Sequence, residues 1–195
     1  MIALTSGHTV YHPNQVAILS GDGKLLREYW HPGFFWDLAI LDLDGDGTEE
    51  ILLGGVNNAR RTATLVVLNP NEMEGAAAEP GKPRFEFQGF PRGRERARVF
   101  FHPSCVSQLV RQWNFVWDLI VRPDSVTVTT WEGTEATAPL VHYHLNRNLQ
   151  IQGVGISDDF QQVHSELRRS GRLNHDFTSK ESEELKRRVT IESHP

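Results

Sequence analysis

The stretch "LAILDLDGDGTEEILLGG", residues 38–55, decides the fold of this chain. Apolar runs at both of its ends have the composition of β-strands, and an acidic, glycine-rich segment separates them. The next apolar run, "TATLVVLNP" at 62–70, follows the turn residues Asn57 and Asn58. Because "LAIL" and "TLVVL" are nearly continuous apolar runs, we expect both strands to be covered on two faces. The sequence therefore predicts a buried hairpin with an acidic loop at one end.

Strand-like runs continue on both sides of this hairpin. Upstream, "QVAIL" and "LLREYWH" flank a tight turn in which Asp22 precedes a glycine, so Asp22 is explained without a metal ion. The segment "FFWDLAI" at 34–40 recurs as "FVWDLIV" at 115–121, which indicates two related β-units. Tryptophans on strands are most often core residues, so we expect Trp36 and Trp117 in this repeat to be buried.

Changes in composition divide the chain into three parts. Residues 1–70 form a β-unit with the acidic loop, 71–95 a connector rich in glycine and proline, and 96–195 a second β-unit. Within the connector, "FEF" can add a short edge strand. We expect one compact, mainly β domain of antiparallel, blade-like hairpin sheets with two C-terminal helices, and not a complete propeller.

The two C-terminal helices carry recognisable start and stop signals. The segment "SDDFQQVHSELRRSG" begins with Ser157 or Asp158 as its N-cap and ends at Gly171. Its apolar residues fall on one face: Phe160, Val163 and Leu167. In "TSKESEELKRRV", Thr178 and Glu181 form a capping-box pair. We expect both helices to cover a sheet.

The overall composition is that of a globular protein. The chain has 195 residues, of which 38% are apolar and 23% charged, and its formal net charge of −5 argues against nucleic acid or an anionic membrane surface as a partner. No apolar run is long enough for a membrane helix, and the first residues lack the pattern of a signal peptide. Cys105 is the only cysteine, so we expect a buried thiol and no intramolecular disulfide.

The acidic loop has the oxygen ligands that a hard cation requires. Calcium takes six to eight oxygens at roughly 2.3–2.6 Å. A nine-residue loop supplies them through side chains at positions 1, 3 and 5, a backbone carbonyl at 7 and an acid at 9. Glycines at 45 and 47 let the backbone curl around the ion. The loop is not an EF-hand, because Leu53 stands where position 12 requires glutamate. The candidate ligands are Asp42, Asp44, Asp46, Thr48 and Glu50.

This stretch resembles the FG-GAP or VCBS-type repeat, the calcium-binding hairpin of integrin-α-like β-propellers. Such repeats carry D-x-[DN]-G-D-G-x-x-[DE] between two apolar strands, and the match here runs from about Leu38 to Gly55. The resemblance implies calcium ligation by Asp42, Asp44 and Asp46, by the Thr48 carbonyl and by Glu50. It covers the loop and not the remainder, since propellers stack several repeats and this chain has one good copy.

We expect the ion to be structural and to clamp the end of the hairpin; the alternative is a solvated turn without an ion. The sequence thus favours a non-catalytic calcium-binding β module for protein-ligand recognition or sensing. Its partner would be an unknown protein or glycan, and the chain could be part of a longer one. Millimolar calcium would fill a modest site, which favours a periplasmic, cell-surface or secreted setting.

Two further sets of residues could bind ligands. His142 and His144 alternate on a predicted strand and would share one face, which suits zinc; a hydrolase with a second metal there is an alternative function. Arginines at period two form either a basic face for an acidic partner or a solvated edge strand protected by charge. These arginines are Arg92, Arg94, Arg96 and Arg98.

Tryptophans provide another alternative, a carbohydrate-binding module. The chain has five: Trp30, Trp36, Trp113, Trp117 and Trp131. Of these, we expect Trp131 to be the most exposed, because it lies at a strand end. A catalytic claim finds no support in the sequence. His102 and Cys105 are close along the chain, but Pro103 intervenes and no orienting third group accompanies them.

Overall fold

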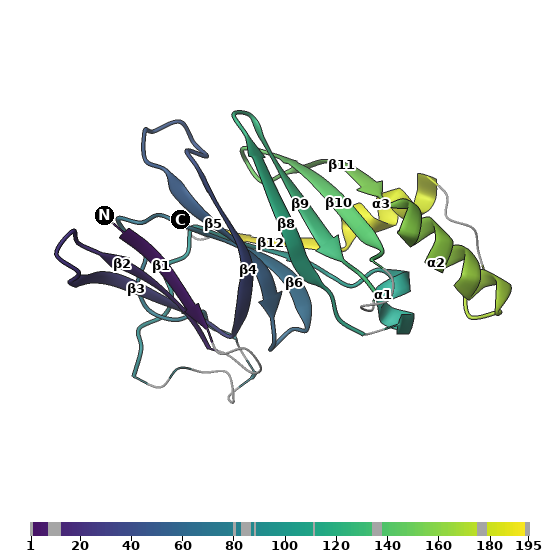
Figure 1. Cartoon of the computed structure of the whole chain (residues 1–195), viewed down its shortest axis with the longest axis horizontal. Helices are drawn as coiled ribbons and strands as arrows, with labels where there is room; N and C mark the ends of the chain where they lie inside the picture. Colours follow the sequence, from purple (N-terminus) through teal and green to yellow (C-terminus); the bar gives the residue numbers. More distant parts are fainter. Residues whose placement is uncertain are drawn as a thin grey trace.

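The computed structural model describes residues 2–7, 13–79, 81–82, 87, 89–110, 112–133, 138–174 and 179–193. Within these ranges the strands form three antiparallel sheets (Figure 1). The first sheet has the order β1-β2-β3, with bounds Ile2–Gly7, Asn14–Leu19 and Leu25–His31. The central sheet has the order β12-β7-β6-β5-β4, with bounds Val189–Ser193, Ala97–Phe101, Thr62–Leu68, Glu50–Asn57 and Gly33–Leu41.

The third sheet has the order β11-β10-β9-β8, with bounds Ile151–Ile156, Leu140–Asn146, Ser125–Trp131 and Phe115–Arg122. Three helices gather at the end of the molecule away from the first sheet (Figure 1). They are α1 (Cys105–Val110), α2 (Asp158–Arg169) and α3 (Ser179–Arg187). The prediction of a mainly β, antiparallel fold is confirmed, and the short helix α1 is an addition to the two helices that the sequence predicted.

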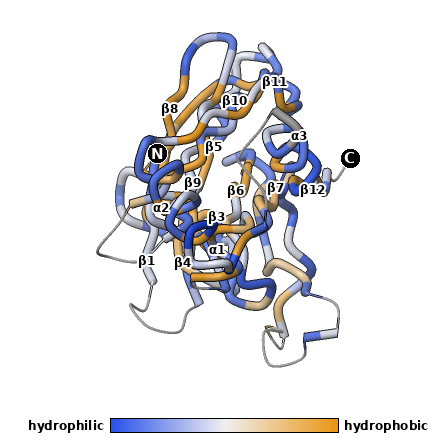
Figure 2. The backbone as a smooth tube through the Cα atoms, turned by 90° about the vertical axis from the view of Figure 1, so that its right-hand side faces the viewer, coloured by the Kyte–Doolittle hydropathy of each residue, from blue (hydrophilic) through white to orange (hydrophobic). Residues whose placement is uncertain are grey.

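The central sheet is the middle layer of the molecule and has a hydrophobic core on each face. The larger core joins it to the third sheet and α2, and the smaller core joins it to the first sheet. Every residue of β5 and β6 is therefore buried, as the apolar run "TLVVL" predicted. Figure 2 shows the hydrophobic residues concentrated along the strands and the hydrophilic ones in the connecting loops and in α3.

The prediction that "LAIL" is covered on both faces is wrong. This run lies in β4, which is the end strand of the central sheet, and Leu38 and Ile40 are 41% and 40% exposed. The end position explains the difference: the neighbouring layers cover the inner face of β4 and leave its outer face in solvent. Apolar content alone does not distinguish an end strand from a central one.

The repeated "WDL" segments lie side by side on β4 and β8. In both strands the pairing register shifts at the tryptophan, between Phe35 and Asp37 and between Val116 and Asp118. The Asp37 carboxylate accepts a hydrogen bond from the Leu119 backbone N–H at 2.7 Å, which ties the two strands together. The repeat is thus a pair of matched bulges at the contact between two sheets.

These bulges turn both tryptophans outward, so the prediction that Trp36 and Trp117 are core residues is wrong. They are 56% and 41% exposed and stack on each other, with ring centroids 5.4 Å apart and an interplanar angle of 24°. A bulge places an extra residue on one strand and redirects its side chain. The expectation that tryptophans on strands lie in the core does not take such a bulge into account.

Helix α2 begins and ends as the sequence predicted. Ser157 is the N-cap: its hydroxyl accepts a hydrogen bond from the Phe160 N–H, and Gly171 has a left-handed φ of +74° after the last turn. The apolar face of the helix joins the larger core through Phe160, Val163 and Leu167. For α3, the predicted cap Thr178 lies outside the described residues.

The connector packs against the first sheet where the structure describes it. Met73 and Ala77 belong to the smaller core, and Trp30 exchanges backbone hydrogen bonds with Gly75 and Ala77 at 2.9 and 2.8 Å. Most of the predicted "FEF" strand lies outside the described residues. None of the described helices is both long and apolar enough to cross a membrane.

Candidate metal centre

The acidic loop connects β4 to β5, and its own backbone organises the carboxylates. The Asp42 carboxylate accepts hydrogen bonds from the N–H groups of Gly45 and Gly47, at 2.7 and 3.1 Å. Asp44 accepts one from the Asp46 N–H at 3.1 Å. Both glycines have positive φ, +77° and +88°, which side chains larger than hydrogen rarely adopt. The glycines therefore permit the curl that gathers the acids, as the sequence predicted.

Three of the five predicted ligands converge. Asp42, Asp44 and Glu50 each offer one oxygen, and these oxygens lie within 4.8 Å of one another. Oxygens bound to one calcium ion at roughly 2.3–2.6 Å can lie at most about 5 Å apart. The three oxygens are therefore close enough for one ion to contact all of them. Glu50 is fully buried, Asp42 is partly buried and Asp44 is exposed, so the group lies at the surface with one buried member.

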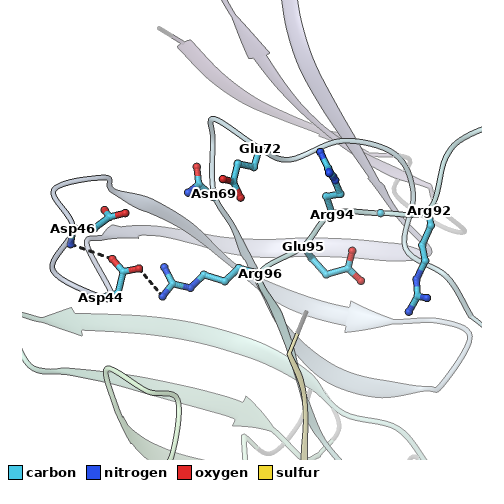
Figure 3. A pocket seen from close by; sticks show the side chains of 9 residues that line it. Asp44, Asp46, Asn69, Glu72, Arg92, Arg94, Glu95 and Arg96 are labelled. Carbon is cyan, nitrogen blue, oxygen red and sulfur yellow. Dashed lines mark hydrogen bonds and ion pairs between the residues drawn. The ribbon is translucent and has the colours of Figure 1, made fainter. Parts of the chain in front are cut away.

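Asp46 and Thr48 lie on the outer part of the loop. The Asp46 carboxylate accepts a hydrogen bond from the Thr48 N–H at 2.6 Å and lines an open hollow (Figure 3). The remaining wall of this hollow comes from Asn69, Glu72 and the segment 92–96. The assignment of Asp46 and of the Thr48 carbonyl as ligands remains a prediction.

Arg96 reaches into the acidic loop and compensates part of its charge. Its guanidinium contacts Asp44 at 2.9 Å, as Figure 3 shows, and Glu50 at 2.7 Å. The hydrogen bond from the Asp46 N–H lowers the pKa of Asp44 most. Partial burial raises this pKa, but the charge of Arg96 lowers it further. Burial opposes ionisation of Arg96, yet Glu50 and Asp44 raise its pKa above the ordinary value. The second oxygen of Glu50 accepts a hydrogen bond from the Leu43 N–H at 2.8 Å.

The four arginines do not form the common basic face considered from the sequence. Only Arg98 lies on a strand, β7, and its side chain is buried among carboxylates. It contacts Glu79 at 3.0 Å, Glu95 at 3.1 Å and Glu192 at 2.7 Å. Arg96 turns to the acidic loop instead. Arg96 and Arg98 therefore belong to two separate ion-pair clusters within this chain, and Arg94 pairs with Glu74 at the surface.

His142 and His144 do share one face of β10, as predicted. Their imidazoles contact the hydroxyls of Thr129 and Thr127 at 3.0 and 3.1 Å. Burial first, and then the neighbouring His144, lower the pKa of His142. In the part of the chain that the structure describes, no cysteine or acidic residue completes a three-ligand group with them.

The prediction that Trp131 is the most exposed tryptophan is wrong. Trp131 is half-buried and packs edge-on against Phe115 and Trp117, at centroid distances of 5.1 and 5.4 Å. Trp36 and Trp117 are the exposed pair. Together with Leu38, they form an apolar strip along β4 and β8 that continues to Ile40 and Ile120.

Sequence reasoning missed a second group of potential metal ligands. Cys105, His164 and Glu181 offer a sulfur, a nitrogen and an oxygen within 4.8 Å of one another. The histidine close to Cys105 in sequence, His102, instead contacts the Thr190 hydroxyl at 3.1 Å. The residues of the group lie on three different helices, so no spacing along the chain indicated them.

Comparisons with family models, with curated proteins and with solved structures find no match to this chain. The interpretation of both ligand groups therefore rests on the geometry and chemistry of their own residues.

Proposed function

We propose that this protein is a non-catalytic calcium-binding β module used for recognition or sensing. The observation that carries the proposal is the convergence of Asp42, Asp44 and Glu50 at the end of the β4–β5 hairpin. The resemblance of this loop to FG-GAP and VCBS-type repeats supports calcium as the ion. Calcium would neutralise the carboxylates and stabilise the hairpin end, since binding to the folded state alone raises stability.

Arg96 gives the site a means to respond to the ion. It occupies two of the three converging carboxylates, Asp44 and Glu50, with its guanidinium. A calcium ion bound to the same oxygens would compete with this positive charge. Loading would then release Arg96 toward the adjacent hollow, where Glu72 supplies a further carboxylate. The exchange of one cation for another would transmit the state of the loop to the surface near residues 92–96.

The proposal is tested by calorimetric titration of the chelator-stripped protein with calcium. We expect one site per chain and a rise in melting temperature, both lost in Asp44→Ala. Asp22→Ala is the matched control, because Asp22 is also an acid in a glycine-containing turn but is paired with Lys24 at 2.8 Å. No heat and no thermal shift at millimolar calcium would refute the proposal.

A second candidate function, glycan binding, is favoured by the stacked and exposed pair Trp36 and Trp117. Exposed indole faces are suited to packing against the apolar faces of sugar rings. Oligosaccharides would quench the fluorescence of the wild-type protein, and Trp36→Ala would abolish this response. A glycan array without hits would leave the apolar strip as a surface for a protein ligand.

A further inference from the structure

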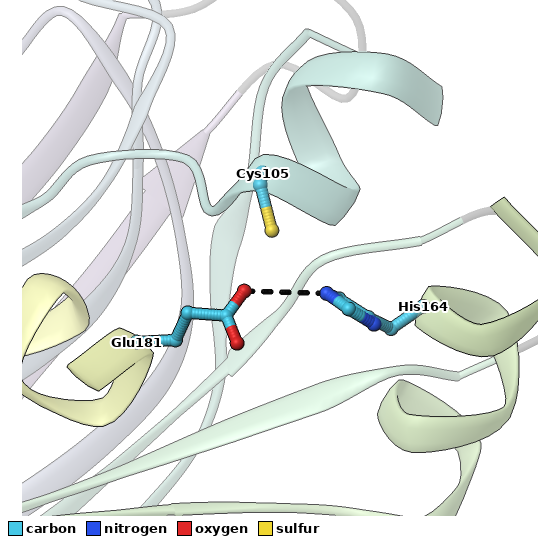
Figure 4. A group of neighbouring side chains, drawn as sticks. All are labelled: Cys105, His164 and Glu181. Atoms are coloured by element: carbon cyan, nitrogen blue, oxygen red, sulfur yellow. Dashed lines mark hydrogen bonds and ion pairs between the residues drawn. The ribbon is translucent and has the colours of Figure 1, made fainter. Parts of the chain in front are cut away.

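Three helices each contribute one metal-ligating side chain to a common point. Cys105 begins α1, His164 lies in the middle of α2, and Glu181 lies in the first turn of α3. In Figure 4 the Cys105 sulfur points into the space between the Glu181 carboxylate and the His164 ring. The imidazole Nε2 is 3.3 Å from the carboxylate Oε1, and the three donor atoms lie within 4.8 Å of one another.

The group is largely withdrawn from solvent. His164 is 2% and Glu181 8% exposed, and Cys105 is half-buried. A small cavity beside the group is lined by Phe160, Leu185 and Arg188 together with Cys105, Glu181 and Glu184. Arg188 itself contacts the Glu184 carboxylate at 2.7 Å and the Pro103 carbonyl at 3.1 Å. The basic residue of this cavity is therefore held by groups outside the Cys–His–Glu cluster.

The arrangement does not suit a thiol nucleophile. In a catalytic relay the imidazole contacts the carboxylate with one nitrogen and the nucleophile with the other. Here the nitrogen that contacts Glu181 is also the one that faces the sulfur (Figure 4). Burial, and then the charge of Glu181, raise the pKa of Cys105 to about 11, so the free thiol stays protonated at neutral pH. A nucleophilic cysteine needs the opposite shift.

We propose that Cys105, His164 and Glu181 form a zinc site, separate from the calcium loop and independent of it. Thiolate, imidazole and carboxylate are the three ligand types of protein zinc sites, and the mixture of soft and borderline donors disfavours calcium and magnesium. Ligands of a tetrahedral zinc ion lie roughly 3.5 Å from each other, so modest side-chain shifts complete the shell. A water molecule would supply the fourth ligand.

The zinc ion would join the helical end of the molecule to the central sheet. Helix α1 follows β7 and helix α3 precedes β12, and these two strands pair with each other. Helix α2 carries the apolar face of Phe160, Val163 and Leu167 into the larger core. One ion bound to all three helices would therefore stabilise their packing. Because the thiol must lose its proton to bind, loading would release a proton.

The test is titration of the chelator-stripped full chain with Co²⁺, which occupies zinc sites and shows thiolate ligation by a charge-transfer absorption band. We expect one Co²⁺ per chain, displacement by Zn²⁺, and loss of the band in Cys105→Ser and in His164→Gln. His102→Gln is the matched control, because His102 is near Cys105 in sequence but contacts Thr190. This variant keeps the band, and so does Asp44→Ala, which removes one candidate ligand from the calcium loop.

Wild-type protein alone supplies a second readout, in case a variant fails to fold. Zn²⁺ is expected to slow alkylation of Cys105 by iodoacetamide, whereas Ca²⁺ leaves the rate unchanged. A folded wild-type chain that shows no band and no protection by zinc would overturn the proposal. So would a band that persists in His164→Gln. Failure of the calcium titration affects neither readout, so the two sites are judged separately.

Discussion

The acidic loop and the helical Cys–His–Glu cluster are two candidate metal sites built in opposite ways. The loop gathers its ligands within nine residues, has an exposed side, and offers only oxygen. The cluster draws one ligand from each of three helices, is mostly buried, and mixes sulfur, nitrogen and oxygen. The comparison shows that a site made by local curvature is readable from spacing, whereas a site made by packing is not.

The two sites also differ in how their charge is compensated without an ion. In the loop, backbone N–H groups and Arg96 stabilise the ionised carboxylates. In the helical cluster, burial keeps the Cys105 thiol protonated. Metal binding would therefore displace a cation in the first case and a proton in the second.

The largest effect that would sharpen this comparison is expected from Arg96→Gln. The variant leaves the buried Glu50 carboxylate without its ion-pair partner, which we expect to cost about 2 kcal/mol of stability in the absence of calcium. Calcium affinity should rise roughly fivefold, the equivalent of about 1 kcal/mol for loss of a partly exposed ion pair. Urea unfolding and calorimetry measure the two changes.

Arg94→Gln is the control for this variant, because the exposed Arg94 contacts only Glu74 among the described ion pairs, at 3.4 Å. It should change neither quantity. A calcium affinity that falls in Arg96→Gln would show that Arg96 supports the ion instead of competing with it.

The helical cluster predicts an alkaline loss of stability. The pKa of Cys105 is raised from 9.0 to about 11, so the folded state holds the thiol proton more tightly than the unfolded state. This contribution is fully present below pH 9 and is lost as the pH rises toward 11; for a partly exposed group it amounts to about 1 kcal/mol. Urea unfolding of wild type and Cys105→Ser across this range measures the difference.

In that experiment the wild-type curve should fall relative to that of Cys105→Ser, and zinc should remove the fall by binding the thiolate. Parallel curves without metal would indicate that the thiol is not held in a desolvated environment.

The loop predicts the opposite response, an acid loss. The pKa of Asp44 is lowered from its ordinary 3.8, first by the Asp46 N–H and also by Arg96. The stabilising contribution of the ionised form is therefore present above pH 3.8 and is lost as the pH falls through the folded value. Carbon-detected NMR of the Asp44 carboxyl follows this titration, and Arg96→Gln should move its midpoint upward. An unchanged midpoint would contradict a close ion pair.

The smallest effect concerns the histidine pair of β10, which lacks a third ligand in the described part of the chain. Burial, and then the charge of His144, lower the pKa of His142 below 6.5, so the folded protein favours the neutral imidazole. The contribution of this neutral form to the stability of the fold is lost as the pH falls below 6.5. NMR titration of the ring protons measures this. His142→Ala should leave cobalt binding intact; a lower number of cobalt ions bound per chain, with the thiolate band retained, would place a second ion at this pair.

Much of the fold could be predicted from local patterns. The hairpin 38–55, the buried strand β6 and the caps of α2 at Ser157 and Gly171 follow from apolar runs, turn residues and capping chemistry. The curl of the acidic loop follows from its two glycines. Each of these features depends on residues that are close together in the sequence, so sequence spacing nearly determines their distance in space.

Other features depended on which layers pack together. Trp36 and Trp117 are exposed because two bulges meet at the contact of β4 and β8, and Leu38 is exposed because β4 is an end strand. These positions have the composition of core residues, and only the order of strands in the sheets reveals their surroundings. The pairing of Arg96 with the loop depends on the same order, since β7, which begins directly after Arg96, is separated from β5 only by β6.

The sequence by itself therefore determined the β class and the central hairpin, and it located the candidate ligands in the contiguous stretch Asp42–Glu50. Only the tertiary structure decided which side chain neutralises that loop, and only it brought Cys105, His164 and Glu181 together. The physical reason is that local geometry is set by the φ and ψ preferences of a few adjacent residues. Contacts between helices instead depend on the packing of whole layers, which no short segment encodes.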